Sequence, residues 1–311
     1  MNHNLTNIFQ GMILIILSPL FMGTLNKIKA LMRGYKGPSV LQVYYDLSKL
    51  SKKDTIRSGR SSFVTEYGPV MALSVAVTCS FMIPVIFVGS KNSLGNLILI
   101  VFLLGGIKLA NALIGLDSSS TFGGMGTSRE LFLSMLAEPV MFLIIMYLYF
   151  QYGTLNIFEI SLNNLHMSTT TTAGDILAFV SFFIVLIVEN ARLPIDNPET
   201  HLELTMIHEA MVLDLSGRDL LLIELASMIK FTIFITMIVN IFIPFGISTS
   251  FAMPMIVEAA GLFLAKVFVV LFVIAMIEVL IAKSRLFRAP DLIAVSFSLI
   301  IAAISFSRFI D

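Results

Sequence analysis

The segment ENARLPIDNPETHLELTMIHEAMVLDLSG, residues 189–217, interrupts an otherwise apolar part of the chain. Apolar stretches of about the length that crosses a membrane lie immediately before and after it. A charged segment in this position predicts a loop between two membrane-spanning helices, where a membrane protein meets water or a partner. Its acidic and histidine side chains are Glu189, Asp196, Glu199, His201, Glu203, His208, Glu209 and Asp214.

The composition of the whole chain is that of a membrane protein. Of its 311 residues, 57% are hydrophobic and only 13% are charged, and the mean hydropathy is +0.93. A soluble domain of this length carries far more charge. We therefore predict an all-α protein that forms a single integral membrane domain over residues 1–311.

Eight apolar stretches predict the membrane-spanning helices. A helix needs roughly 20 apolar residues to cross the hydrocarbon core of a bilayer. The fifth stretch is the shortest and its start is the least sharply marked. The predicted polytopic bundle of eight transmembrane helices has its spans at about residues 8–26, 68–89, 95–116, 131–152, 175–191, 221–244, 254–281 and 290–307.

The positions of Lys and Arg predict how this bundle is oriented. Most of them fall in alternate loops, whereas the opposite side carries only Lys91 and Arg308. Because cytoplasmic loops are enriched in Lys and Arg, both termini are expected outside the cytoplasm. A multi-pass protein of a bacterial or archaeal cytoplasmic (inner) membrane fits this pattern. The expected cytoplasmic loops contain Lys27, Lys29, Arg33, Lys36, Lys49, Lys52, Lys53, Arg57, Arg60, Arg129, Arg192, Arg218, Lys283, Arg285 and Arg288.

The first cytoplasmic loop contains a candidate interfacial helix. From Pro38 onward, apolar and polar residues alternate at helical spacing in the sequence SVLQVYYDLSKL. This pattern predicts an amphipathic helix that lies at the membrane surface. A basic surface helix without any specific partner would have the same pattern. A second, short helix is expected within residues 200–213 of the acidic loop.

Several kinds of site are excluded by what the sequence lacks. The single cysteine, Cys79, lies inside the second span, so the chain cannot supply the thiolates of an iron–sulfur cluster. The sequence has no nucleotide-binding glycine motif and no HExxH motif. His201 and His208 lie seven residues apart, whereas helical zinc sites usually place two histidines four residues apart. Interfacial hydrogen bonding is therefore the interpretation favoured over a metal site, and no bound cofactor is expected.

Ionisable residues lie within several predicted spans, where a charge is costly, and six of them are candidates for a function there. Each costs roughly 2.5–3.5 kcal/mol near the membrane centre, so an idle charge is not expected there. A chain of carboxylates and amines can pass protons, because burial and neighbouring charges bring their pKa values toward neutrality. The alternative is a set of structural ion pairs. These residues are Lys108, Glu138, Lys230, Glu258, Lys266 and Glu278.

Three motifs carry a resemblance to a known family. They are GPSVLQVYYDLSKLSKKD at 37–54, GTSRELFLSMLAEP at 126–139 and the acidic loop at 189–217. Together with eight spans, they resemble a membrane protein that two kinds of complex share. One is respiratory complex I, where it is known as subunit 1. The other is the group 4 NiFe hydrogenases, where it is of the formate hydrogenlyase subunit 4 or hydrogenase-4 component C type.

The resemblance implies roles for the matching residues. In the family, the acidic loop and the first basic loop form the docking surface for a peripheral redox arm, and carboxylates lead from there into the membrane. The implied ion-coupling set is Glu138, Asp196, Glu199, Glu203, Glu209 and Asp214, joined by the intramembrane charges Lys108, Lys230, Glu258, Lys266 and Glu278. The implied docking or structural set is Gly37, Pro38, Arg129, Glu130, Arg192, Pro194, His201, His208 and Gly217.

The resemblance also implies partners and a function. We expect a noncatalytic membrane subunit that anchors a peripheral hydrogenase-like arm and couples its electron transfer to movement of H⁺ or Na⁺. The NiFe centre and iron–sulfur clusters would be bound by large and small peripheral subunits at the cytoplasmic face. Antiporter-like subunits would lie beside the chain in the bilayer, and no nucleic acid is expected.

Two alternatives stay open. The first is a quinone-site subunit of NADH:quinone oxidoreductase, although the family's quinone-chamber motif is reduced here to GYKGPSVLQ at 34–42. The second is a stand-alone secondary transporter with Lys230 or Lys266 opposite Glu258. Transporters are often built from inverted repeats, and the two halves of this sequence show no convincing similarity.

Overall fold

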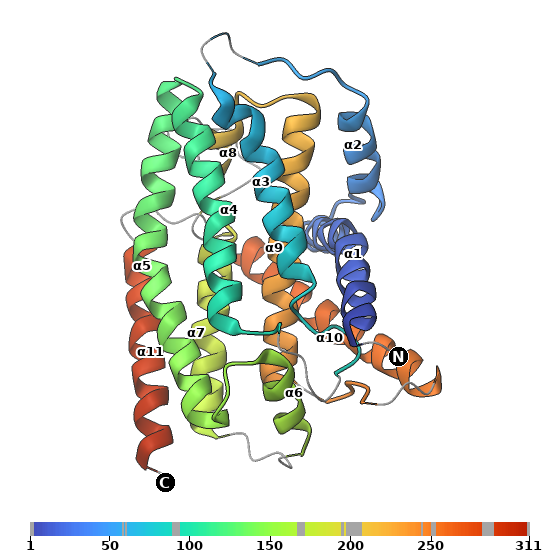
Figure 1. Ribbon diagram of the computed structural model, residues 1–311, viewed down its shortest axis with the longest axis vertical. Helices are drawn as coiled ribbons and strands as arrows, with labels where there is room; N and C mark the ends of the chain where they lie inside the picture. Colours follow the sequence, from blue (N-terminus) through green and yellow to red (C-terminus); the bar gives the residue numbers. More distant parts are fainter. Residues whose placement is uncertain are drawn as a thin grey trace.

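The computed structural model is a bundle of α-helices (Figure 1). It describes residues 3–57, 59, 61–88, 94–166, 172–193, 196, 207–243, 245–249, 253–281 and 289–309. Within these residues, extended pairing is limited to two isolated bridges. The helices are α1 (His3–Met32), α2 (Gln42–Ser51), α3 (Phe63–Ser80), α4 (Leu97–Asp117), α5 (Thr121–Tyr152), α6 (Ile157–His166), α7 (Ala173–Glu189), α8 (His208–Val212), α9 (Gly217–Phe242), α10 (Met253–Leu280) and α11 (Ala289–Phe309).

Seven of the described helices, α1, α3, α4, α5, α9, α10 and α11, are long and apolar enough to cross a membrane. The predicted fifth span corresponds to α7, which has 17 residues and falls just short of that length. It nevertheless packs against both α5 and α11 (Figure 1). The all-helical membrane fold is therefore confirmed, with seven helices of spanning length in place of the eight that were predicted.

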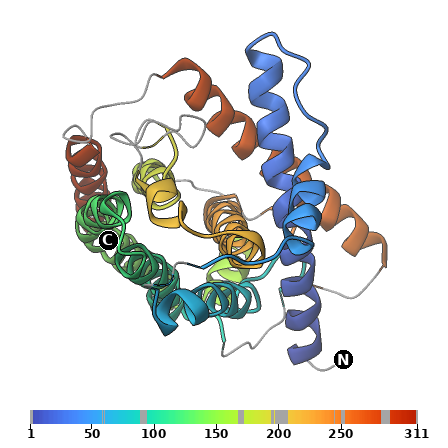
Figure 2. The same ribbon diagram turned by 90° about the horizontal axis from the view of Figure 1, so that it is seen from above.

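The helices are arranged so that the polar links gather at one end. The helices α2 and α8 and the link between α4 and α5 lie at the upper end of Figure 1. The helix α6, the link between α3 and α4 and the C-terminus lie at the lower end. Seen from above, α9 lies among α3, α4 and α7, while α1 and α10 cross one another at one side (Figure 2). The motifs singled out in the sequence thus converge on the upper end.

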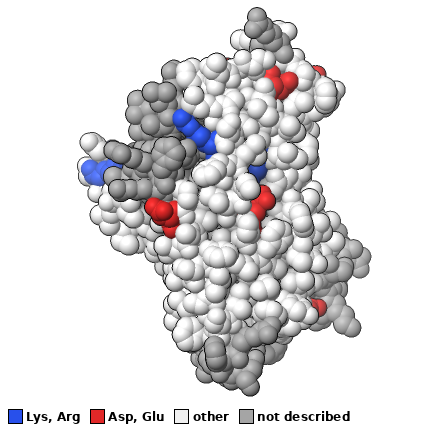
Figure 3. Space-filling view, turned by 90° about the vertical axis from the view of Figure 1, so that its left-hand side faces the viewer, with Lys and Arg blue, Asp and Glu red and all other residues white. Residues whose placement is uncertain are grey.

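The bundle's outer face has the character expected next to lipid. Figure 3 shows the side formed by α5 and α11, where most of the visible described surface carries no charge. The exposed side chains of these two helices include Phe132, Met135, Phe142 and Phe297. A soluble protein rarely exposes so large an apolar surface. The chain is therefore a multi-pass membrane protein.

The predicted amphipathic helix is present as α2. Val43 is its only buried residue, and the remainder of the helix is partly or fully exposed. The Tyr44 hydroxyl donates a hydrogen bond to the Ile16 carbonyl oxygen of α1. Burial raises the pKa of Tyr44, which keeps the phenol in its donating form. One tyrosine therefore anchors α2 onto the first membrane-spanning helix, next to the turn that contains Pro19.

Capping by side chains moves two helix boundaries away from the prediction. The helix α3 begins at Phe63, because the Ser62 hydroxyl accepts from the Val64 amide and the Asp117 carboxylate accepts from the Ser62 and Thr65 amides. Residues 121–130, which lie between the third and fourth predicted spans, form the first part of α5, which begins after the capping Ser120. Because hydrogen bonds satisfy their N-terminal amides, α3 and α5 both begin earlier in the chain, and nearer the upper end, than predicted.

Candidate functional site

Three hollows follow one another from the upper end of the bundle to its side. The first has a volume of about 340 Å³, the second about 20 Å³ and the third about 290 Å³. Neighbouring hollows share lining residues: His208 and Ser227 belong to the first and second, while Lys108 and Glu189 belong to the second and third. The polar groups that line them therefore form a connected series, which we call the charged series.

The first hollow lies among α1, α2, α8, α9 and the residues that follow α7. Its walls are mixed: Met22, Val43 and Ile223 are apolar, and most of the remaining lining residues are polar. Such a mixture suits a chamber in contact with water. Its ionisable lining residues are Lys29, Asp46, Arg192, Asp196, His208, Glu209 and Glu224.

A buried group of three charges closes one wall of this hollow. Lys29 Nζ lies 3.0 Å from Glu278 Oε2, and Arg192 Nη1 lies 3.6 Å from Glu278 Oε1. All three side chains are at most 7% exposed. The Arg192 guanidinium also lies 4.5 Å from the centre of the Phe231 ring. These contacts join α1, α9, α10 and the end of α7, so Glu278 stabilises the packing of four segments.

The acidic residue Asp196 organises α8. Its Oδ2 accepts hydrogen bonds from the Ile207 amide at 3.1 Å and the His208 amide at 3.2 Å. A carboxylate at a helix N-terminus satisfies amides that have no partner inside the helix. The short helix predicted within 200–213 is thus present at His208–Val212, and His208 faces the first two hollows.

The second hollow contains the densest cluster of buried charge. The Lys108 ammonium donates to the Glu189 carboxylate, and also to the Ser134 hydroxyl at 3.0 Å. The Lys230 ammonium donates to the Glu189 main-chain carbonyl at 2.6 Å and lies 3.5 Å from Glu189 Oε2. Glu189 therefore binds two lysines, one on α4 and one on α9.

Glu130 completes the lining of this second hollow and is also buried. With Glu189 it brings two carboxylates and two ammonium groups into one small polar space. Buried charges are stable when each has an opposite charge or hydrogen bonds close by. Among the residues that the structure describes, no three histidine, cysteine or acidic side chains lie close enough together to hold a metal ion.

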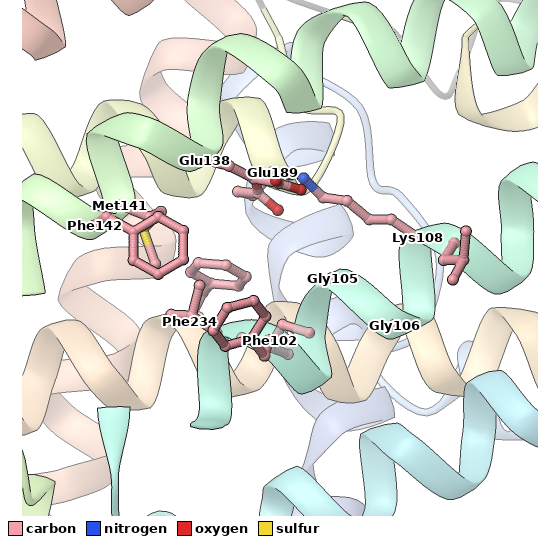
Figure 4. A pocket seen from close by; sticks show the side chains of 12 residues that line it. Phe102, Gly105, Gly106, Lys108, Glu138, Met141, Phe142, Glu189 and Phe234 are labelled. Carbon is pink, nitrogen blue, oxygen red and sulfur yellow. Dashed lines mark hydrogen bonds and ion pairs between the residues drawn. The ribbon is translucent and has the colours of Figure 1, made fainter. Parts of the chain in front are cut away.

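The third hollow lies between α4 and α5 (Figure 4). The Lys108 side chain reaches toward Glu189, and Glu138 lies beside that pair. Phe102, Phe142 and Phe234 surround the remainder of the space. Glu138 is exposed on the surface of the described chain. The charged series thus reaches the side of the bundle near the middle of α5.

The Ser216–Gly217 pair of the acidic loop has a docking role within the chain. The Ile56 amide donates to the Ser216 hydroxyl at 2.8 Å, and this hydroxyl donates to the Ile56 carbonyl at 3.0 Å. Gly217 has a positive φ of 54°, and a Cβ there would lie 2.5 Å from the Asp54 carbonyl oxygen. Only glycine fits this close approach. These contacts hold the basic segment after α2 against the start of α9.

Arg57 strengthens the same attachment. Its Nε lies 2.8 Å from Asp219 Oδ2 on α9, and its Nη1 lies 2.9 Å from Glu66 Oε1 on α3. The Asp219 carboxylate, as hydrogen-bond acceptor, raises the pKa of Arg57 further above its usual value. The first basic loop and the end of the acidic loop, which are about 160 residues apart in sequence, are therefore one surface in space.

Lys266 and Glu258, which the transporter alternative would place opposite one another, lie in different surroundings on α10. The Lys266 ammonium donates to the Ile243 carbonyl at 2.8 Å and to the Phe245 carbonyl, both just past the end of α9. Glu258 is exposed on α10. Lys266 therefore caps the C-terminus of α9, where the helix leaves carbonyl groups without partners. The structure places both residues outside the charged series.

The remaining predicted residues are dispersed over the upper end. Asp214 is exposed, and Arg129 is half-buried with its guanidinium 3.1 Å from the Met125 sulfur. Gly37 and Pro38 are exposed in the link before α2, where Gly37 has a φ of 64°. Pro194, Glu199, His201 and Glu203 lie outside the residues that the structure describes.

The central role of Glu189 and the contributions of Lys29, Asp46 and Glu224 were not predicted from the sequence. Glu189 was counted with the acidic loop, yet it is the last residue of α7 and is buried. One signal was available: Lys108 and Lys230 lie in apolar stretches with no acidic residue three or four positions away, so each needs a carboxylate from elsewhere. Lys29 and Asp46 gave no such signal, because basic and acidic residues are ordinary in a loop.

Comparisons with known proteins agree with this architecture. The chain is 29% identical to hydrogenase-4 component C of Escherichia coli (strain K12) over 291 residues, which cover 93% of this chain and 91% of that protein. It is 28% identical to formate hydrogenlyase subunit 4 of the same organism, over 91% of this chain and 92% of that protein.

A solved structure shares the fold over nearly the whole chain. It is a chain of the membrane-bound sulfane sulfur reductase, an archaeal respiratory membrane complex. The superposition has a TM-score of 0.76 at 18% identity and covers 96% of this chain and 99% of the other. The family model described as NADH dehydrogenase matches residues 5–307. This chain therefore belongs to the NADH dehydrogenase family of membrane proteins.

Proposed function

We propose that this chain is a noncatalytic membrane subunit of a multisubunit redox complex, in which it couples electron transfer in a peripheral arm to ion movement. The observation that carries the proposal is the charged series. It connects a water-accessible hollow at the polar end with a carboxylate on the side of the bundle, through lining residues that neighbouring hollows share. A purely structural anchor has no need for such a series.

The contacts of Glu189 would allow a change of charge at one residue to alter the protonation of other residues in the charged series. Glu189 interacts with Lys108 through its carboxylate and with Lys230 through both its carboxylate and its carbonyl. In a site of low dielectric, a change of charge on one member alters the protonation of its neighbours. A charge arriving near His208 or Asp196 would therefore shift the proton population at Glu189 and then at Glu138.

The proposed partners follow from the polar upper end of the bundle and from the exposed end of the charged series. The surface around Ser216, Gly217 and Arg57 would bind a peripheral hydrogenase-like arm at the cytoplasmic face, with both termini of the chain on the opposite side. That arm's large and small subunits would hold the NiFe centre and iron–sulfur clusters. Antiporter-like membrane subunits would receive the coupled ion, H⁺ or Na⁺, from the side of the bundle.

The relatives support this assignment. Two are named as components of a hydrogenase and of a formate hydrogenlyase, and the solved relative belongs to a respiratory membrane complex. The three are aligned with this chain over at least 91% of its length. Their shared membership in large complexes favours a subunit over the stand-alone transporter that the sequence left open.

The test is to measure electron flow and ion movement separately in the reconstituted complex. We expect Lys108→Met and Glu189→Gln to lower the number of ions moved per electron at least about tenfold, while electron flow continues. The control is Glu258→Gln, which changes an exposed carboxylate outside the charged series. Unchanged coupling in both variants, with the assembled complex recovered intact, would refute the route.

A second function, that of a quinone-site subunit, has one observation in its favour. The first hollow measures about 340 Å³ and combines apolar walls at Met22, Val43 and Ile223 with several ionisable groups. Ligand pockets commonly have this mixture of an apolar lining and a few polar groups. Addition of a soluble quinone to the purified complex separates the candidates, because only the second predicts quinone-dependent electron uptake.

A further inference from the structure

The third hollow is open at the side of the bundle, where lipid or another protein must cover it. Phe102 is 65% exposed and Leu109 is 52% exposed at its walls. Gly105 also lines it, and a Cβ built on Gly105 would meet no atom within 4 Å. The volume of about 290 Å³ has room for a long side chain. The surface is therefore shaped to receive a group from outside.

An exposed carboxylate at this hollow favours a positively charged group as the one that it receives. Glu138 lies near the middle of the 32-residue α5 and forms no hydrogen bond or ion pair with another described residue. A carboxylate facing lipid near the middle of a spanning helix is costly, because hydrocarbon offers it neither an opposite charge nor hydrogen bonds. A lipid acyl chain would leave this cost in place, whereas a cation would remove it.

The net charge of the cluster next to Glu138 also favours a cation as the incoming group. Lys108 and Lys230 supply two positive charges to the second and third hollows, while Glu130, Glu138 and Glu189 supply three negative ones. Both lysines already bind Glu189. When all five groups are ionised, the cluster therefore has an excess of one negative charge, and Glu138 is its exposed carboxylate.

We propose that the third hollow is the docking site for a transmembrane helix of a partner membrane subunit, and that this helix carries a Lys, Arg or His side chain that pairs with Glu138. The apolar part of that side chain packs among Phe102, Phe142 and Leu109. The inference rests on the part of the proposed function that places the chain in a membrane complex. It does not depend on the proposed ion route.

The first test is photo-crosslinking in native membranes with the complete complex. The photoreactive residue p-benzoylphenylalanine replaces Phe102 at the hollow or, as a control, Phe268, which is 53% exposed on α10. We expect the position-102 variant alone to yield a cross-link to one membrane subunit, within one helical turn of a basic residue. Cross-linking of position 102 to lipid alone, or to a helix without a nearby basic residue, would overturn the proposal.

The second test fills the hollow from within. Gly105→Leu adds a side chain where the described structure leaves space, and it replaces a poor helix former with a good one. Gly261→Leu is the matched control on α10, because a Cβ there also meets nothing within 4 Å. With the cross-linking probe at position 102, we expect Gly105→Leu to lower the yield about tenfold and Gly261→Leu to leave it unchanged. Equal yields in the two variants would contradict docking in the hollow.

A charge exchange tests the ion pair itself. Glu138→Lys should lower the cross-link yield about tenfold, and replacement of the partner's basic residue by Glu should restore it in that background. Failure of the second change to restore the yield would exclude the pair. If Lys108→Met leaves ion movement coupled while position 102 still cross-links as expected, the ion route is wrong and the docking site stands.

Discussion

The ammonium group of Lys29 lies 3.0 Å from Oε2 of Glu278, and this pair joins the first membrane-spanning helix to α10. Arg192 reaches the other oxygen of the same carboxylate at 3.6 Å. One anion therefore interacts with two buried cations. This relationship explains why a residue proposed from sequence as part of an ion path also holds the bundle together.

Replacement of Glu278 should destabilise the protein strongly. Glu278→Gln removes the anion that the buried Lys29 and Arg192 share, and removal of one partner from a buried pair costs about 3–5 kcal/mol. We expect a lower unfolding temperature in detergent and partial release of α10, seen as faster amide hydrogen exchange. Glu258→Gln on the exposed side of α10 is the control and should leave both quantities unchanged.

Replacement of Gly217 should release the basic segment that follows α2. Gly217→Ala places a Cβ 2.5 Å from the Asp54 carbonyl oxygen at a φ of 54°, which costs on the order of 1–3 kcal/mol. We expect faster trypsin cleavage at Lys52, Lys53 and Arg57 and weaker binding of the peripheral arm. Gly124→Ala, in a helical position with open space, should leave the cleavage rate as it is. Equal cleavage in both variants would argue against this attachment.

Lys266 should prove to be a structural residue. Lys266→Met removes the donor that caps the Ile243 and Phe245 carbonyls, and hydrogen bonds from a charged group contribute about 1.5–3 kcal/mol each. We expect a lower free energy of unfolding with an unchanged number of ions moved per electron. Lys266→Arg keeps a cationic donor and should recover part of the stability. A loss of coupling in a stable Lys266→Met complex would return this lysine to the ion path.

Asp117 should control the first turn of α3. Its Oδ2 accepts from the Ser62 amide at 2.9 Å and the Thr65 amide at 3.1 Å. Loss of such a cap costs roughly 0.5–2 kcal/mol. We expect Asp117→Ala to speed amide hydrogen exchange at residues 62–65, while Asp214→Ala, at an exposed position, leaves it unaltered. Slow exchange in both variants would mean that the turn is held by other contacts.

The membrane fold could be predicted from sequence because hydropathy and the length of a span are local properties. The predicted spans overlap α1, α3, α4, α5, α7, α9, α10 and α11. The helix boundaries were less accurate. The second span was predicted to continue to residue 89, whereas α3 ends at Ser80. The fourth span was predicted to begin at residue 131, whereas α5 begins at Thr121. Caps supplied by Ser62, Asp117 and Ser120 made the difference at the helix starts.

The candidate site could be predicted only in part, because its contacts join residues far apart in the chain. Lys108 and Lys230 were recognised as costly charges, and both lie in the charged series. Lys266 gave the same signal and instead caps a neighbouring helix. Glu189 falls at the end of the fifth predicted span and was counted with the acidic loop, because nothing near it in sequence shows that it meets Lys108, which is 81 residues away. Charge and hydropathy show that a buried group needs a partner, and only the fold shows which one.

The attachment of Lys230 has a consequence for how the proposed route would work. Its ammonium is hydrogen-bonded at 2.6 Å to a main-chain carbonyl and only more distantly, at 3.5 Å, associated with the carboxylate of the same residue. Neutralisation of the Glu189 side chain would leave the main-chain bond in place. The junction between α7 and α9 can therefore change its electrical state while the lysine stays bound, so that a signal could cross it without the displacement of a helix.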